Sequence, residues 1–330
     1  MKTIRPQESA LVPRKMKGFV KFGAYDDLET IVKSQVFLPT FISGLSRAGK
    51  TVMVEQVCAN LGREMMRVNF SEETDEEGLI GGFRLSESEN GVTITTWMDG
   101  PVVTAMRNGN VLLLDEIDKA THKCMCLQPI LEGSPVYIKK TGEMIYPKAG
   151  FNIIATANTK GQGDLTGKFL SAQSLDEAFL DRFSITIEHN YPPEGVEKQI
   201  ISFHLDGQTV TAVDSRFIDD LVIWANNIRK NYMEERTTDL ISTGRLIHIV
   251  KTYRVFRCPF KAVRYGISRF DESMQGVFWE MFTKYFPYQE GDLSPVTGKV
   301  TGTNFIKRMA EGMDLSEFNT KYRVGPFKNK

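Results

Sequence analysis

Cysteine and histidine are both scarce in this sequence. Among its 330 residues there are four cysteines and four histidines. Four cysteines are too few for a disulfide scaffold in a chain of this length, so we expect a protein of the reduced cytosol. Cys124 and Cys126 have no second Cys or His pair at ligand spacing, which favours core packing over metal binding. The histidines are scattered along the chain and indicate neither a metal centre nor His-based catalysis.

Long apolar runs and an excess of either charge are missing as well. No run approaches the roughly 18–20 apolar residues of a membrane span, and the N-terminal residues lack the apolar segment of a signal peptide. We therefore expect no membrane association. The 41 Lys and Arg residues balance the 41 Asp and Glu residues. This balance argues against broad electrostatic capture of nucleic acid but allows a local basic stripe.

With 41% apolar and 25% charged residues, the composition is that of a globular protein. The length suits one large domain or two modest ones. Short apolar runs alternate with helical stretches, and these runs lie at 36–38, 66–70, 111–114, 152–156 and 184–187. Because continuous apolar runs suit strands that are buried on both faces, the alternation predicts a doubly wound parallel sheet of the α/β class. Two β-hairpins, at 83–97 and 136–146, are expected to interrupt it.

A change of pattern at Tyr191-Pro192-Pro193 indicates a domain boundary. The residues beyond it have helical periodicity, with one shared face formed by Phe217, Leu221, Trp224 and Ile228. From about Glu290 the chain is rich in Gly, Thr and Lys. We therefore divide the chain into four parts: an N-terminal extension (1–35), an α/β core (36–192), a smaller α-helical domain (193–290) and a tail (291–330) with one helix expected around 305–313.

A glycine-rich loop is the most specific motif. It reads Gly44-Leu45-Ser46-Arg47-Ala48-Gly49-Lys50-Thr51, and it lies between a strand expected over 37–42 and a helix expected over 52–61. The backbone N–H groups of such a loop wrap a phosphate at the positive end of the helix that Val52 begins. The pattern predicts that Lys50 reaches the β- and γ-phosphates of a nucleotide and that Thr51 ligates Mg²⁺.

Two adjacent carboxylates end the apolar run at 111–114. They belong to Asp115 and Glu116. Burying carboxylates is costly unless they meet a cation or water. In a chain with a phosphate-binding loop, we expect Asp115 to hold Mg²⁺ through water and Glu116 to polarise the attacking water. Asp118 is interpreted as a helix N-cap or a local charge partner.

Three further polar residues are candidates for the same chemistry. Asn158 follows the run at 152–156, where it is either an ordinary turn residue or a hydrogen-bond donor to the γ-phosphate or the attacking water. Arg182 lies where a helix gives way to a strand; it either stabilises phosphoryl transfer from a neighbouring subunit or pairs with Asp181. Arg245 lies in the first turn of a helix capped by Ser242, where a cation opposes the macrodipole preference and indicates a partner anion.

Together these motifs resemble AAA+ ATPases, with details of the MoxR type. The details are Asp99-Gly100-Pro101-Val102-Val103, the two expected hairpins and Asp181-Arg182-Phe183. The stretches at 155–167 and 190–193 are similar to the AAA+ small subunit of aerobic cobaltochelatase and to chelatase-subunit-like ATPases of tailed phages. The resemblance covers about residues 12–270. It implies a P-loop AAA+ core followed by a helical lid, in the cytoplasm, or in the host cytoplasm if a phage encodes the chain.

The resemblance also implies a homo-oligomeric ring, usually a hexamer, with ATP and Mg²⁺ bound between subunits. Five residues would then act within their own subunit: Lys50, Thr51, Asp115, Glu116 and Asn158. Arg182 would be an arginine finger that reaches the neighbouring site, and Arg245 matches a second sensor that acts in cis or in trans. The sequence departs from its relatives at Arg47, where many have Gly, and at Thr243-Gly244, where they often have Ser-Pro.

The function that the resemblance implies is an ATP-hydrolysing motor. Such a motor remodels a protein partner, typically one with a von Willebrand A-like domain, or drives metal insertion into a tetrapyrrole by other subunits. The alternative is a nucleic-acid translocase or restriction-type NTPase, which predicts DNA-stimulated hydrolysis that falls steeply with salt. A non-hydrolysing, nucleotide-gated scaffold is a third interpretation, against which Glu116 and Arg182 both argue. The phosphate contacts leave the choice between ATP and GTP open.

Overall fold

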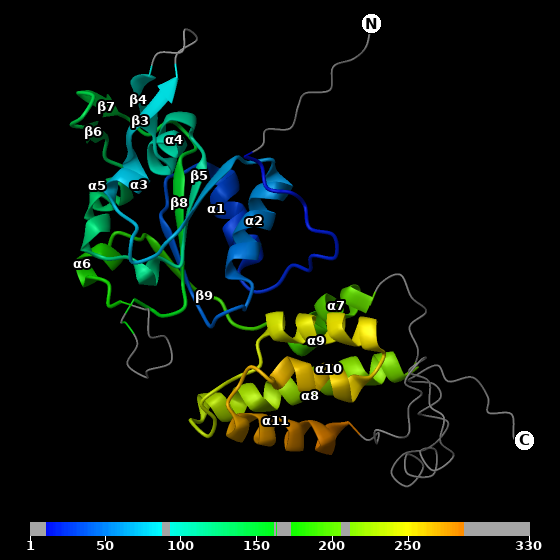
Figure 1. The fold of residues 1–330 in the computed structure, drawn as a ribbon. Coiled ribbons are helices and arrows are strands. Elements are labelled where there is room, and N and C mark those ends of the chain that lie inside the picture. Colours follow the sequence, from blue (N-terminus) through cyan, green and yellow to red (C-terminus); the bar gives the residue numbers. More distant parts are fainter. Residues whose placement is uncertain (1–10, 88–92, 162, 164–172, 206–211, 287–330) are drawn as a thin grey trace, which may run out of the picture. The chain divides into compact units, whose positions relative to one another are not determined.

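The computed structural model describes residues 11–87, 93–161, 163, 173–205 and 212–286 (Figure 1). The chain divides into two compact units, Met1–Asn190 and Tyr191–Lys330. We call them the core unit and the lid unit and describe each by itself. The helix expected around 305–313 and the turn of the first expected hairpin lie outside the described residues.

The core unit contains a five-stranded parallel sheet in the order β2-β5-β8-β1-β9. Its strands are β1 (Thr40–Ser43), β2 (Met65–Asn69), β5 (Val111–Asp115), β8 (Asn152–Ala157) and β9 (Ile185–Glu188). The strands β1, β5 and β8 are buried along their whole length, as parallel strands covered on both faces must be. The predicted α/β class with a parallel sheet is therefore confirmed.

The first strand begins later than predicted. Residues 36–38 precede it, and Val36 is 55% exposed. Pro39 separates them from β1 and has no backbone N–H to donate to a neighbouring strand. Residues 36–38 of the predicted apolar run thus lie outside the sheet, and the strand expected over 37–42 is observed at Thr40–Ser43.

Helices cover the two faces of the sheet. On one face, α1 (Tyr25–Ser34) and α2 (Lys50–Leu61) pack against Leu113. On the other, α4 (Pro101–Asn108) packs against Leu112 and Leu114, since successive residues of a strand point to opposite faces. Helix α1 lies inside the N-terminal extension, where we predicted no helix.

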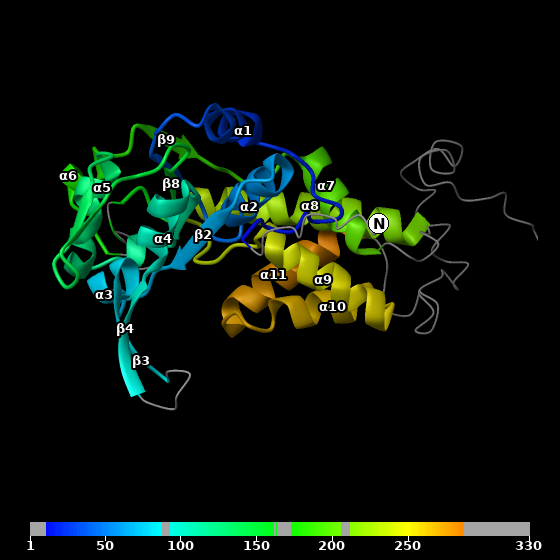
Figure 2. The ribbon, with the colours of Figure 1, turned by 90° about the horizontal axis from the view of Figure 1, so that it is seen from above.

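Two antiparallel hairpins follow short helices of the core unit. The first joins β3 (Gly81–Glu87) to β4 (Thr93–Asp99) and projects from the unit in Figure 2. The second joins β6 (Val136–Ile138) to β7 (Glu143–Ile145). Gly81 has φ 135, and a Cβ there would lie 2.4 Å from the Met98 carbonyl oxygen, so the base of the first hairpin requires glycine. Both predicted hairpins are confirmed. The remaining short elements are α3 (Glu76–Ile80), η1 (Ile117–Lys119), η2 (His122–Leu127), α5 (Gln128–Leu131) and α6 (Glu177–Leu180).

All the secondary-structure elements in the described residues of the lid unit are helices. Its elements are α7 (Glu194–Ser202), η3 (Phe203–Leu205), α8 (Ala212–Met233), α9 (Thr243–Phe256), α10 (Pro259–Ile267) and α11 (Glu272–Tyr285). Phe217 and Trp224 of α8 are fully buried, and Phe282 of α11 lies against both rings. No helix of the described residues is long and apolar enough to cross a membrane.

A buried ion pair joins three helices of the lid unit. The Arg229 guanidinium on α8 donates to both carboxylate oxygens of Glu197 on α7, at 2.7 and 2.8 Å. Thr243, the first residue of α9, donates to the same carboxylate at 2.5 Å, and Arg229 Nε donates to the Ile241 carbonyl at 2.8 Å. The Glu197 side chain is 0% exposed and that of Arg229 is 9% exposed. The charges are therefore paired and desolvated together.

Replacing Arg229 with methionine is expected to destabilise the lid unit by about 3–5 kcal/mol, because the Glu197 carboxylate would remain buried without its counter-ion. Hydrogen exchange of the full chain measures this, with faster exchange expected in α7, α8 and α9 and wild-type rates in β5 and β8. The matched double substitution of Arg229→Met and Glu197→Leu removes both charges and should restore most of the protection. Unchanged exchange in the single variant would contradict the prediction.

Candidate nucleotide-binding site

The glycine-rich loop connects β1 to α2 with a backbone that glycine makes possible. Gly44 and Gly49 have φ of 154 and 106, and a Cβ on Gly44 would lie 2.1 Å from the His189 carbonyl oxygen. Arg47 also has a positive φ, of 57. Glycine adopts this conformation without strain, whereas Arg47 adopts it with a Cβ. The loop ends where α2 begins, at Lys50, so its amides lie at the positive end of a helix dipole.

The Lys50 ammonium is held inside the loop. Its Nζ donates to the carbonyl oxygens of Gly44 and Leu45, at 2.6 and 3.0 Å, and to Asn158 Oδ1 at 3.1 Å. Burial lowers the pKa of Lys50 to about 8, against the opposing effect of nearby carboxylates. The structure thus brings Lys50 and Asn158 together, although they come from different ends of the core sequence.

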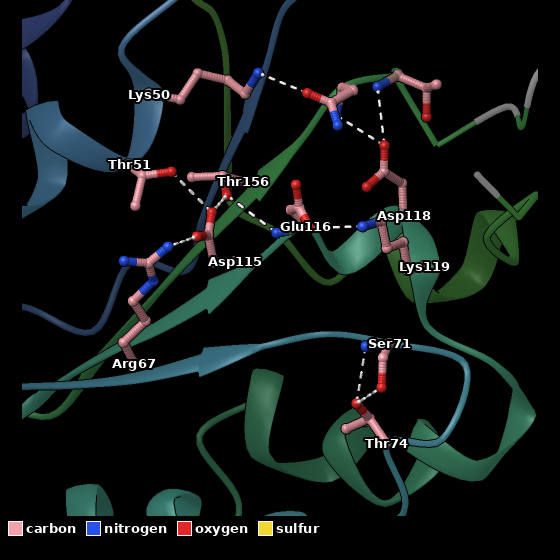
Figure 3. A network of polar contacts seen from close by, with 12 residues as sticks. Lys50, Thr51, Arg67, Ser71, Thr74, Asp115, Glu116, Asp118, Lys119 and Thr156 are labelled. Atoms are coloured by element: carbon pink, nitrogen blue, oxygen red, sulfur yellow. Dashed lines mark hydrogen bonds and ion pairs between the residues drawn. The ribbon is translucent and has the colours of Figure 1, made fainter. Parts of the chain in front are cut away.

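Asp115, at the end of β5, is the centre of a polar network (Figure 3). Its Oδ1 accepts a hydrogen bond from Thr51 Oγ1 at 2.9 Å and another from Thr156 Oγ1. Its Oδ2 is ion-paired with the guanidinium of Arg67, which also contacts Glu55. Thr51 was expected beside Asp115. Arg67 and Thr156 were missed, because each is a single polar residue in a strand and carries no local motif.

The donor set around Asp115 fits Mg²⁺. A hydroxyl and a carboxylate supply hard oxygen ligands at one place, and Mg²⁺ is commonly held by one or two such groups together with water and substrate phosphates. Within the described part of the chain, no group of three or more His, Cys, Asp or Glu side chains could hold a metal by itself. Phosphate and water would therefore have to complete the coordination of an ion held by Thr51 and Asp115.

Glu116 follows Asp115 in a left-handed conformation, with φ 58 and ψ 42. This conformation is uncommon for a residue other than glycine and is found preferentially at functional sites. The amide of Glu116 donates to Thr156 Oγ1 at 3.3 Å. Its carboxylate is 38% exposed and pairs with Lys119 Nζ at 2.7 Å. A role as a base would require the carboxylate to exchange Lys119 for a water molecule.

Of the two roles expected for Asp118, local charge partner and helix N-cap, the first agrees with its electrostatic interaction with Lys50 and the second does not hold. It is 1% exposed, and its Oδ2 accepts hydrogen bonds from the amides of Asn158 and Thr159, at 2.8 and 3.2 Å. Burial raises the pKa of this carboxyl against the effect of those two amides. The N-cap of η1 is Glu116, so the interpretation of Asp118 as a helix cap is wrong. Asp118 instead fixes the chain after β8, and with it the orientation of Asn158 toward Lys50.

Residues of the glycine-rich loop and of the network around Asp115 surround one cavity of about 370 Å³. It lies at the carboxyl ends of the parallel strands, where α/β sheets commonly bind ligands. Nine of the predicted site residues line it: Ser46, Arg47, Gly49, Lys50, Thr51, Val52, Asp115, Glu116 and Asn158. Gly44, Leu45 and Ala48 belong to the same loop. Arg67, Asn69, Thr156 and Ala157 also line the cavity and were not predicted as site residues.

The two arginine candidates belong to other elements of the chain. Arg182 follows α6, where its Nε pairs with Glu132 at 2.8 Å and its guanidinium donates to the Ala178 carbonyl. It does not line the cavity of its own chain as the structure describes it, and its ion pair is with Glu132 rather than with Asp181. Arg245 belongs to the lid unit, where its amide donates to the Ser242 cap at 3.2 Å.

Comparison with known proteins agrees with this geometry. Residues 39–183 match the family model of the AAA domain, dynein-related subfamily. The chain is 32% identical over 170 residues to the aerobic cobaltochelatase subunit CobS of a Sinorhizobium species, covering 51% of each. It is 30% identical over 193 residues to an uncharacterized protein of Staphylococcus haemolyticus, covering 57% of this chain and 67% of that protein. Among solved structures, NtrX from Brucella abortus in complex with ADP has a TM-score of 0.46 at 13% identity, covering 72% of this chain and 52% of NtrX.

The parallel sheet, the phosphate-type loop and the carboxylates at the end of β5 define a nucleotide-binding protein of the AAA class. Residues 39–183, which include the whole loop and both carboxylates, match the dynein-related subfamily of AAA domains. Within that class the chain is similar to the cobaltochelatase subunit CobS, so the predicted resemblance to AAA+ proteins and to this subunit is confirmed. The chain spans about half the length of CobS.

Proposed function

We propose that the chain binds ATP with Mg²⁺ and hydrolyses the nucleotide. The observation that carries this proposal is the convergence of Lys50, Thr51, Asp115 and Glu116 on one cavity of about 370 Å³ at the start of α2. An ammonium, a helix N-terminus and hydroxyl and carboxylate oxygens are the groups that phosphoryl transfer requires at one place.

Each residue has a definite task in this proposal. The amides of the loop and Lys50 Nζ would bind the phosphates, and Lys50 would exchange its carbonyl partners for phosphate oxygens. Thr51 and Asp115 would hold Mg²⁺, which neutralises the charge that develops on the phosphates. Glu116 would accept a proton from the attacking water. Asn158, oriented through Asp118, would hold that water or the γ-phosphate by hydrogen bonds.

Arg182 and Arg245 would complete the site in a ring. Arg182 lies outside the cavity of its own described chain, as an arginine that serves a neighbouring subunit would. The resemblance implies a homo-hexamer in which Arg182 is the finger and Arg245 the second sensor. The coupled task would be the remodelling of a protein partner, one with a von Willebrand A-like domain, or the driving of metal insertion by other subunits. A nucleic-acid translocase is the alternative, supported by the same core.

The substitution Glu116→Gln tests hydrolysis. It keeps the shape of the side chain and removes the base, so we expect ATP binding within about twofold of wild type and turnover lower by about 10²–10⁴-fold. Phosphate release and equilibrium binding of a fluorescent ATP analogue measure the two quantities. Glu73→Gln, a change to an exposed carboxylate of the same unit, is the matched control and should leave both unchanged. Full turnover in Glu116→Gln would exclude the proposed base.

The same variant separates the two coupled tasks. Loaded with ATP, Glu116→Gln should retain a protein partner, whereas the double variant with Lys50→Ala, which cannot load ATP, should not. Wild-type hydrolysis should also be indifferent to added DNA. Hydrolysis that DNA stimulates, with a stimulation that falls steeply between about 50 and 200 mM salt, would favour the translocase.

A further inference from the structure

Arg67 places a cation against the carboxylate that the proposed function assigns to Mg²⁺. It lies in the middle of β2, where the sheet register puts it opposite Leu113, two residues before Asp115 on β5. One Nη atom of its guanidinium is ion-paired with Asp115 Oδ2, and the other donates to Glu55 Oε1 on α2 at 3.0 Å. Its side chain is 44% exposed and lines the same cavity as Lys50 and Thr51.

The carboxylate of Asp115 has limited capacity for a further partner. It is 5% exposed as a side chain and accepts hydrogen bonds from Thr51, Thr156 and Arg67. A carboxylate has about four lone-pair sites, so three are already used. A hydrated Mg²⁺ on the same oxygens would also bring a divalent charge close to a guanidinium, which costs electrostatic energy in a partly buried site.

Glu55 is a second carboxylate partner of Arg67. Its carboxylate is 29% exposed and lies within hydrogen-bond distance of the other Nη atom. A guanidinium keeps its charge at every physiological pH and presents several donors in a fixed fork, so Arg67 can release Asp115 and remain paired with Glu55. Asp115 and Glu55 are therefore two carboxylate partners of the Arg67 guanidinium, and loss of the first leaves the second in place.

We propose that Arg67 competes with Mg²⁺ for Asp115, so that binding of the metal is coupled to release of Arg67 from Asp115, with Glu55 as its remaining carboxylate partner. This inference rests on the proposed function. Arg67 is thus a positioning residue that sets how much Mg²⁺ the site requires. Arg67 is paired with Asp115 in the absence of Mg²⁺ and would release that carboxylate when Mg²⁺ binds together with the nucleotide.

The test is the Mg²⁺ dependence of nucleotide binding, which requires no hydrolysis. Fluorescence anisotropy of a mant-ADP probe on the full chain is measured across free Mg²⁺ concentrations and in EDTA. Arg67→Met removes the competing cation, so the Mg²⁺ midpoint should fall by about three- to fivefold. Glu55→Gln removes the carboxylate that retains Arg67 after its release from Asp115. The Mg²⁺ midpoint should therefore rise. Binding in EDTA should be unchanged in both variants, which also shows that they are folded.

The double variant makes the coupling falsifiable. With methionine at position 67 there is no cation to compete, so adding Glu55→Gln should have no further effect on the midpoint. An effect of Glu55→Gln that persists in this background is a direct effect of its charge and would overturn the coupling. Weaker mant-ADP binding by Arg67→Met in EDTA would make Arg67 a phosphate ligand and would also overturn it. Failure of the wild-type chain to bind mant-ADP at all would instead reject the proposed function.

Discussion

Replacing Lys50 with alanine is expected to weaken nucleotide binding by about 100-fold or more. The ammonium is buried, lies within 3.1 Å of three acceptors inside the loop, and is the cation placed to meet the β- and γ-phosphates. Truncating one partner of a buried, hydrogen-bonded charge pair costs about 2–5 kcal/mol, and each 1.4 kcal/mol is about tenfold in affinity. Titration calorimetry with ADP and ATP measures the loss.

Lys33→Ala provides the matched control for this prediction. Lys33 is an exposed lysine in the last turn of α1, in the same unit, and its loss should leave the affinity unchanged. Circular dichroism and unfolding of the Lys50→Ala chain establish that the fold is retained. If the folded Lys50→Ala protein binds ATP as tightly as wild type, the phosphate-loop assignment fails.

Replacing Arg182 with alanine is expected to leave nucleotide affinity intact and to reduce ATP turnover by about 10³–10⁵-fold, the effect typical of an arginine finger. The reason is that Arg182 would act on a neighbouring subunit rather than on the cavity of its own chain. Steady-state phosphate release and ADP binding, measured on the same preparation, separate the two effects. Equal loss of binding and turnover would place Arg182 in its own site instead.

The ion pair between Arg182 and Glu132 supplies the matched control for this prediction. Glu132→Ala removes the same ion pair and leaves the arginine in place. If Arg182 serves only that pair, the two variants should behave alike. If it is a finger, Glu132→Ala should keep most of the turnover. Mixing Arg182→Ala with Glu116→Gln subunits should then restore part of the activity, because some interfaces would combine an intact finger with an intact base.

Much of the fold and of the site follows from contiguous stretches of sequence. The five strands of the sheet are apolar runs, and only the first begins later than predicted, after Pro39. The loop from Gly44 to Thr51 is a local backbone structure whose glycines are required where they stand. Patterns of this kind can be found without knowing which strands are neighbours.

The partners of the site residues depend on strand order, and local pattern does not reveal that order. Asp115 meets Arg67 and Thr156 because β5 lies between β2 and β8, and these residues are far from it in the sequence. The interpretation of Asp118 as a possible helix cap was wrong for the same reason. Its partners are amides that follow β8, so a reading limited to its own helix suggested a cap. Helix α1 was missed because the N-terminal extension carries no motif that draws attention to it.

The sequence by itself determined the class of protein, because the phosphate loop and the Asp115-Glu116 pair are contiguous motifs at the ends of recognisable strands. The balanced charge and the few cysteines excluded other classes of protein without identifying this one. Tertiary structure alone decided the distant partners of the two buried carboxylates: Asp115 is held by Arg67, and Asp118 accepts hydrogen bonds from the backbone beyond β8. The physical reason is that a hydrogen bond or an ion pair requires two groups to lie close in space. For residues far apart in the sequence, the order of the strands decides which groups do.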